Sequence, residues 1–287
     1  MITPHLILMG ETVLRRFFAL IKRIVYYYNE KQIPIASAAL CYYMMMSVFP
    51  LIICLYTLLG SKYDDAMRIL AFVESFIRNE TSESIHGFLA YVERNHSSAM
   101  FYAGITVLLT SASAAIRSME VTIGRMQGGD RYPGFGRIVF SLVFAVVFLL
   151  ATWFAIFVMF TSRDLIELVN AYIPFVDIRG SWLWIKYLML AGILFLFQWG
   201  IYRFCRKKRA RYPTWPGAIL ATVGTVVMSL IFSAFIAASA RYSLVYGSLA
   251  SVILLMLWLY FSCQVIYIGA AFNLAIRDVR RMEYSTV

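Results

Sequence analysis

Hydrophobic residues fall in six long runs along the chain, and polar residues are concentrated between them. The clearest run is 246–273, where 28 consecutive residues include no Asp, Glu, Lys or Arg. An α-helix rises ~1.5 Å per residue, so about 20 apolar residues cross a hydrocarbon core of ~30 Å. The other runs lie at about 35–60, 99–118, 138–160, 182–202 and 214–238. The pattern predicts an all-α integral membrane protein, with six transmembrane helices in a single domain, 1–287.

Two segments outside these runs have helical periodicity but carry too many charges to cross a membrane. In 12–33, apolar residues such as Phe18, Ile21 and Val25 recur at helical spacing opposite basic residues. We predict an interfacial amphipathic helix whose cations face anionic headgroups; packing against other protein is the alternative. Residues 61–98 contain two amphipathic stretches, for which we predict an extracytoplasmic helical hairpin.

Composition and charge agree with this class. Hydrophobic residues make up 61% of the chain and charged residues 14%, whereas the net charge is +11. The N-terminal segment, 117–137, 203–212 and the C-terminal tail together hold eighteen Lys and Arg, and the alternate loops, 61–98, 161–181 and 239–246, hold seven. Cytoplasmic loops of membrane proteins are enriched in Lys and Arg, so both termini are predicted to be cytoplasmic. The same distribution argues against nucleic acid as a partner.

Candidate catalytic and metal-binding residues are sparse. The four cysteines form no CxxC pair and three lie in apolar runs, where a small hydrophobic role is the expectation. The three histidines have no metal-ligand spacing. The glycine-rich segment 127–137 lacks the Lys-Ser/Thr ending of a P-loop and reads as a turn. We therefore expect no catalytic centre, no cofactor and no metal site.

Polar residues inside the runs are the main functional candidates, because polar groups at membrane depth are costly and tend to face the bundle interior. Pro50 predicts a kink and a freed carbonyl at Met46. Arg117 could attract an anionic headgroup, or pair with Glu120 three residues later. We predict a polar seam, reached near Pro50, formed by Tyr42, Ser47, Pro50, Thr110, Ser111, Ser113, Arg117, Gln198, Tyr246, Gln264 and Asn273. The alternative is that these groups satisfy one another across helices.

Small residues recur every four positions in the fifth run. They are Gly217, Ala221, Thr225, Ser229 and Ser233. A stripe of small side chains lets another helix approach closely, so we predict a helix-packing surface that faces protein rather than lipid.

Several segments resemble a known protein family. They are ASAALCYYMMMSVFPL at 36–51, SASAAIRSME at 111–120, PTWPGAILATV at 213–223 and YGSLASVILLMLWLYFSCQVIYIGAAFN at 246–273. Together they resemble the YihY/BrkB family of bacterial inner-membrane proteins, once labelled ribonuclease BN. The resemblance implies six spans, both termini in the cytoplasm and a place in the bacterial inner membrane. It implies no settled biochemical activity.

Two classes of function fit these observations. The first is a transporter or lipid-handling, flippase-like protein, with membrane lipids as partners and an anionic lipid or small solute as substrate. The alternative is a membrane scaffold or envelope assembly factor that acts through 61–98. A ribonuclease needs an acid–base or cation-binding cluster, yet the loops offer only scattered carboxylates such as Asp64, Asp65 and Glu74, so we predict no enzyme activity. The predicted spans contain no Asp or Glu, which disfavours a proton-relay carrier.

Overall fold

The computed structural model describes residues 4–59, 98–129, 134–160, 182–206, 212–238 and 249–285. These residues form seven helices: α1 (Pro4–Glu30), α2 (Ile33–Leu59), α5 (Ser98–Met126), α6 (Phe135–Phe160), α8 (Trp182–Cys205), α9 (Trp215–Ala238) and α11 (Leu249–Ser285). The predicted all-α membrane fold is confirmed. The hairpin predicted within 61–98 lies outside the described residues, apart from the first residue of α5.

Four helices contain segments long and apolar enough to cross a membrane. These segments are Phe135–Ile156, Trp184–Cys205, Trp215–Ile236 and Val252–Met282. The helices α2 and α5 have 27 and 29 residues. At ~1.5 Å per residue both exceed the thickness of the hydrocarbon core. The count of six membrane spans stays a prediction, because α2 contributes only a shorter apolar stretch, Ile33–Val48, among the residues searched.

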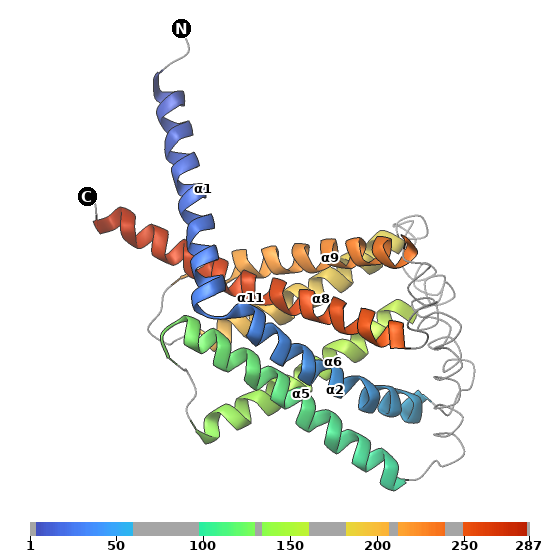
Figure 1. The fold of residues 1–287 in the computed structure, drawn as a ribbon. Coiled ribbons are helices and arrows are strands. Elements are labelled where there is room, and N and C mark those ends of the chain that lie inside the picture. Colours follow the sequence, from blue (N-terminus) through green and yellow to red (C-terminus); the bar gives the residue numbers. More distant parts are fainter. Residues whose placement is uncertain are drawn as a thin grey trace, which may run out of the picture.

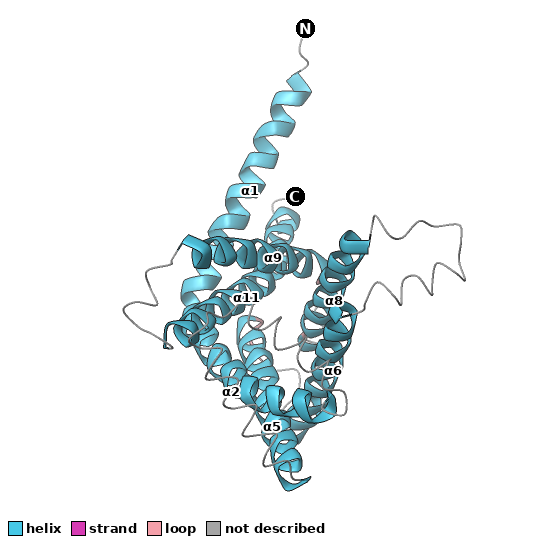
Figure 2. Cartoon of the chain, turned by 90° about the vertical axis from the view of Figure 1, so that its right-hand side faces the viewer, coloured by secondary structure: helices cyan, strands magenta, loops and turns pink. Residues whose placement is uncertain are grey.

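Six of the helices form a closed ring. Each helix packs against the next in the order α2, α5, α6, α8, α9 and α11, and α11 packs back against α2. Figure 2 shows this arrangement nearly along the helix axes. Additional contacts join α5 to α8 and α5 to α11 across the ring. The faces of α5, α8, α9 and α11 that point inward therefore form the interior of the bundle.

The helix α1 lies crosswise to the ring and extends beyond it, as Figure 1 shows. A two-residue turn at Lys31 and Gln32 separates α1 from α2. Pro34 explains the break, because its ring would clash with the carbonyl of Glu30 if α1 continued as one straight helix. Gln32 adopts a φ of 50°, a left-handed conformation uncommon for a residue other than glycine. The helices α1 and α11 both extend from the same end of the ring (Figure 1).

Two helices run past the predicted spans. The helix α5 continues beyond 118 to Met126, and α11 continues beyond 273 to Ser285. Apolar runs mark where a helix meets lipid, whereas a helix can continue into water if its polar residues allow it. At the end of α5, Gly128 has a φ of 76° and Gly129 donates to the carbonyl of Gly124 at 2.9 Å, the pattern of a Schellman cap.

Candidate functional site

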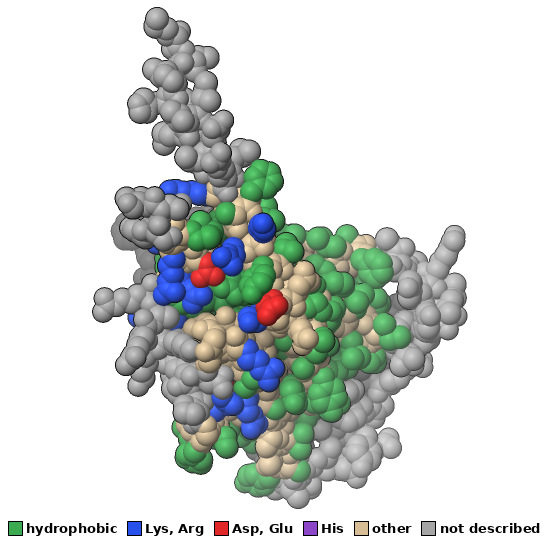
Figure 3. Space-filling view, turned by 60° about the vertical axis from the view of Figure 1, so that its left-hand side comes forward, with side chains coloured by type: hydrophobic (Ala, Val, Ile, Leu, Met, Phe, Trp, Pro, Cys, Tyr) green, Lys and Arg blue, Asp and Glu red, His purple; other side chains and the backbone are tan. Residues whose placement is uncertain are grey.

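Basic side chains gather at one end of the ring, which we call the cationic end. It contains the C-terminal ends of α5, α8 and α11, the N-terminal ends of α2, α6 and α9, and α1 lying across them. All Lys and Arg residues of the described segments lie on or toward this end except Lys186, near the start of α8. Figure 3 shows the basic side chains on this face, with few carboxylates among them.

A small pocket opens at the cationic end, where α5, α8, α9 and α11 meet. Its walls are Ile123, Gln127, Tyr202, Tyr212, Thr214, Ala270, Asn273 and Leu274. It leaves room for about one water molecule. Tyr212 and Thr214 are buried, yet neither side-chain hydroxyl has a hydrogen-bond partner among the described residues. Two residues of the pocket wall therefore carry hydroxyl groups that no described residue binds.

Tyr212 lies between two guanidinium groups. The guanidinium carbons of Arg206 and Arg277 are each 5.7 Å from the centroid of its ring, within cation–π range. Arg206 also donates through Nη1 to the Tyr212 carbonyl at 2.5 Å. Burial raises the pKa of Tyr212 to about 12, although both arginines oppose the shift. The hydroxyl is therefore protonated at neutral pH and can donate a hydrogen bond.

Asn273 joins α11 to the start of α9 and forms one wall of the pocket. Its Oδ1 accepts from the Gly217 amide at 2.7 Å, and its Nδ2 donates to the Thr214 carbonyl at 3.0 Å. The first contact satisfies one of the amides that every helix N-terminus leaves without an internal partner. Because Asn273 is buried, these bonds fix the position of α9 against α11.

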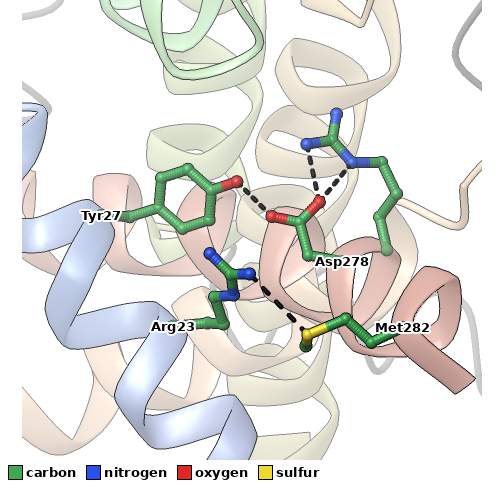
Figure 4. A network of polar contacts seen from close by, with 5 residues as sticks. Arg23, Tyr27, Asp278 and Met282 are labelled. Atoms are coloured by element: carbon green, nitrogen blue, oxygen red, sulfur yellow. Dashed lines mark hydrogen bonds and ion pairs between the residues drawn. The ribbon is translucent and has the colours of Figure 1, made fainter.

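The helix α1 is attached to α11 beside this pocket, as Figure 4 shows. The Tyr27 hydroxyl donates to Asp278 Oδ2 at 2.5 Å, and Arg23 contacts the Met282 sulfur at 3.8 Å. Arg277 binds the other Asp278 oxygen through Nε and Nη2, at 2.9 and 2.8 Å. Burial, the hydrogen bond to Asp278 and the charge of that carboxylate raise the pKa of Tyr27 to about 12. The tie between α1 and α11 therefore persists at physiological pH.

Buried polar groups continue from the pocket into the interior of the bundle. The Tyr202 hydroxyl donates to the Ile266 carbonyl at 2.6 Å. Gln198 and Ser262 each lie one helical turn before these residues, and because α8 and α11 are parallel they share one level. Both are buried, and neither Gln198 Nε2 nor Ser262 Oγ has a hydrogen-bond partner in the part of the chain that the structure describes. Gln198 Oε1 accepts a long bond of 3.4 Å from Thr222.

A third such group lies on the side of α11 that faces α5. The Tyr267 side chain is fully buried, and its hydroxyl has no hydrogen-bond partner. The side chains of Ser118 and Thr122 on α5 lie close to this hydroxyl. Buried polar groups in folded proteins are nearly always paired, so three orphaned groups in one interior indicate a place where a polar guest would be stabilised.

The predicted seam residues lie in several places. Three of them bond to carbonyls of their own helix: Ser47 to Met44, Thr110 to Thr106 and Val107, and Ser111 to Val107 and Leu108. Four bond to another helix: Ser113 to Ser141, Gln198 to Thr222, Gln264 to Tyr28, and Asn273 to Thr214 and Gly217. Among the described residues, no hydrogen bond joins two members of the predicted seam.

The remaining seam residues do not extend this network. Tyr42 is exposed, Pro50 is buried within α2, and Tyr246 lies outside the described residues. Arg117 is half-buried and does not pair with Glu120. Glu120 instead forms an ion pair of 2.7 Å with Arg137 of α6, because α5 continues as a helix and the turn after it brings α6 alongside.

The predicted small-residue stripe on α9 faces α11 over most of its length. A Cβ atom on Gly217 would collide with the Gly269 carbonyl, and Ala221 is fully buried. Ser229 accepts a hydrogen bond from the Trp258 indole at 3.3 Å. Thr225 is half-buried, whereas Ser233 is exposed, so the two helices separate near the end opposite the cationic end.

Several residues at this site were not predicted from the sequence. Tyr202, Tyr212, Thr214 and Tyr267 gave no signal because tyrosine and threonine are common near the ends of membrane helices. Glu120 was placed at a helix end and not recognised as buried, although it is only 1% exposed. A span boundary set a few residues later would have identified it as an intramembrane carboxylate.

The fold and the site together define an α-helical integral membrane protein with a cationic end and a polar interior. The chain belongs to the family described as virulence factor BrkB, whose family model matches residues 24–286. The ribonuclease-like protein YfkH of Bacillus subtilis, so named only provisionally, is 23% identical over 86% of this chain and 90% of that protein. A UPF0761 membrane protein of Alteromonas mediterranea is 25% identical, over 87% of this chain and 85% of its own length. No solved structure matches.

Proposed function

We propose that this chain is a transporter or lipid-handling, flippase-like protein of the bacterial inner membrane, which moves the polar part of its substrate along the interior faces of α8, α9 and α11. The observation that carries this proposal is the set of orphaned polar groups at Gln198, Ser262 and Tyr267. An unpaired polar group in a water-free interior is costly, and polar groups at membrane depth commonly mark substrate pathways.

The cationic end supports an orientation for this pathway. Lys and Arg are enriched on the cytoplasmic side of membrane proteins, so we place the pocket and both termini in the cytoplasm. Reporters fused after residues 30, 125 and 280 should then read as cytoplasmic. An external reading at 125 would reverse the direction of the pathway.

The direct test is movement of a headgroup-labelled phosphatidylglycerol between the leaflets of proteoliposomes. Gln198→Leu replaces the amide by an apolar group of similar size, and we expect it to slow movement by about threefold or more, the effect of losing one intramembrane polar contact. Thr152→Val is the matched control, because the Thr152 hydroxyl already bonds to the Phe148 carbonyl of its own helix. Equal rates for the wild type, both variants and empty liposomes would remove the proposal and favour a scaffold acting through 61–98.

Ribonuclease activity is a separate question, because YfkH is named as ribonuclease-like. We infer that this chain is not a ribonuclease, since the described residues bring together no group of three or more His, Cys, Asp or Glu that could hold a catalytic metal ion. Purified protein incubated with single-stranded and structured RNA should leave both intact. Cleavage that co-purifies with the folded protein would overturn this inference.

A further inference from the structure

The pocket at the cationic end combines the features of an anion site. Tyr212 and Thr214 provide hydroxyl donors that no described residue uses. The Tyr212 ring is flanked by the guanidinium groups of Arg206 and Arg277. Thr214 directly precedes the N-terminus of α9, where the aligned peptide dipoles place partial positive charge. The two hydroxyl-bearing residues line the pocket, and the two guanidinium groups and the helix terminus lie beside these residues.

We propose that this pocket binds the phosphate group of an anionic substrate, with one phosphoryl oxygen inside the pocket between Tyr212 and Thr214 and the remaining oxygens within reach of Arg206 and Arg277. This inference rests on the proposed function, because it names the chemical class of substrate that enters the polar interior at this end. The shared chemistry is a phosphate ester or free phosphate.

The size of the pocket fits a single oxygen atom. Its room for about one water molecule admits a phosphoryl oxygen but not a whole headgroup. The rest of the phosphate must remain outside the pocket, and we place it against the guanidinium groups beside the Tyr212 ring. Arg277 uses Nε and Nη2 on Asp278, which leaves Nη1 for a ligand. Charge-assisted hydrogen bonds from arginine are among the strongest that phosphate forms.

The pocket walls are held rigid by contacts that do not involve the proposed donors. Asn273 uses both ends of its amide on α9, and Tyr202 uses its hydroxyl on α11. A preformed wall with unused donors reduces the cost of ordering on binding. It also means that removal of a donor hydroxyl should leave the fold intact.

The test is binding of soluble probes to the purified full-length protein in nanodiscs. The probes are dihexanoyl phosphatidylglycerol, inorganic phosphate and dihexanoyl phosphatidylcholine, with affinity measured by calorimetry. Thr214→Val, Tyr212→Phe and Arg277→Gln should each weaken binding of the anionic probe by about tenfold. Arg281→Gln and Tyr187→Phe are matched controls, because both residues are exposed outside the pocket. Unfolding temperatures identify any variant that loses affinity through misfolding.

The probes separate the two sources of phosphate. Binding of phosphatidylglycerol that phosphate displaces only weakly indicates a lipid headgroup, whereas tight binding of phosphate alone indicates a soluble solute; either supports the site. Equal affinity for phosphatidylcholine and phosphatidylglycerol restricts recognition to the phosphate group itself and supports the site only if the pocket variants weaken both, whereas no change in any pocket variant overturns it. Gln198→Leu lies outside the pocket and should retain binding while transport falls. If Gln198→Leu loses transport while the pocket variants bind the probes as tightly as the wild type, the phosphate site is rejected and the proposed transport function is retained.

Discussion

Two antiparallel helix pairs cross the bundle and are held together in different ways. The helices α9 and α11 meet through small residues, and a Cβ added to Gly269 would lie 2.6 Å from the Gly217 carbonyl oxygen. The helices α5 and α6 meet through polar side chains, namely the Ser113–Ser141 hydrogen bond of 2.9 Å and the Glu120–Arg137 ion pair. The α9–α11 pair depends on the close approach of the two backbones. The α5–α6 pair depends on hydrogen bonds and ion pairs between side chains.

The difference teaches where the bundle can tolerate change. Backbone contact leaves no space to relax, so a substitution there must separate the helices. When one member of a polar pair is removed, the helices can repack. The loss of stability then depends on whether the remaining polar group finds another hydrogen-bond partner. The rigid pair also carries Asn273, which joins α9 to α11 and forms one wall of the pocket, whereas Ser113, Ser141, Glu120 and Arg137 of the polar pair are not among the pocket walls.

The largest effect is expected for Gly217→Leu in the rigid pair. The new side chain would meet the backbone of α11. Adding one or two methylenes to a packed core typically costs about 1–3 kcal/mol of stability, and we expect Gly217→Leu to cost more than that. We expect loss of folded protein in a fluorescence-detected size-exclusion assay. Gly192→Leu is the control, because no atom lies within 4 Å of a Cβ at that position. A normal elution profile for Gly217→Leu would show that α9 and α11 can separate without cost.

The next largest effect is expected for Arg137→Gln, which leaves the Glu120 carboxylate buried without its charged partner. Breaking one side of a buried ion pair costs about 3–5 kcal/mol. The double variant Glu120→Gln with Arg137→Gln should recover part of this loss, because it removes both charges. The free energy of unfolding in a denaturing detergent measures both. Equal losses for the single and double variants would mean that Glu120 is not stabilised by Arg137.

A smaller effect is expected for Asn273→Leu, which removes both bonds between α11 and the start of α9. Each buried polar group left without a partner costs about 1–3 kcal/mol in soluble proteins, and closer to ~0.6 kcal/mol in membranes. We therefore expect a loss of about 1–2 kcal/mol in the same unfolding assay. Gln264→Leu is the comparison, because Gln264 has only one long bond of 3.3 Å, to Tyr28. A larger loss for Gln264→Leu would reverse the assigned importance of the two amides.

Sequence reasoning found the helices more readily than it found the site. Each apolar run overlaps one helix of the described residues, and the stripe at Gly217 and Ala221 predicted the packing face of α9. The partner of that stripe was not predictable, since Gly269 carries no periodic signal of its own. The helices α5 and α11 continue past the predicted spans to Met126 and Ser285, because apolar side chains are needed only within lipid whereas helical hydrogen bonds also form outside it.

The contacts of the polar residues were harder to predict from the sequence than the helices were. Asn273 and Gln198 were identified as costly groups, but whether a polar side chain bonds to its own helix, to a neighbour or to nothing depends on the rotation of each helix. Ser111 and Ser113 are two residues apart, yet the first bonds within α5 and the second reaches α6. Tyr212 and Thr214 became relevant only because four helix ends meet around them.

The smallest predicted effect distinguishes the two serines that join α5 to α6. Ser141 Oγ lies 2.9 Å from the Ile138 carbonyl and 2.9 Å from Ser113 Oγ; when its single proton is donated to the carbonyl, Ser113 is the donor in the Ser113–Ser141 bond. Ser141→Ala removes the acceptor of Ser113, whereas Ser113→Ala leaves the bond from Ser141 to Ile138 in place. The Ser113 hydroxyl can turn to the Leu109 carbonyl one turn earlier, which limits the loss in Ser141→Ala to about 0.6 kcal/mol. Unfolding in denaturing detergent should therefore rank Ser141→Ala as the less stable variant, and the reverse order would assign the proton to the other serine.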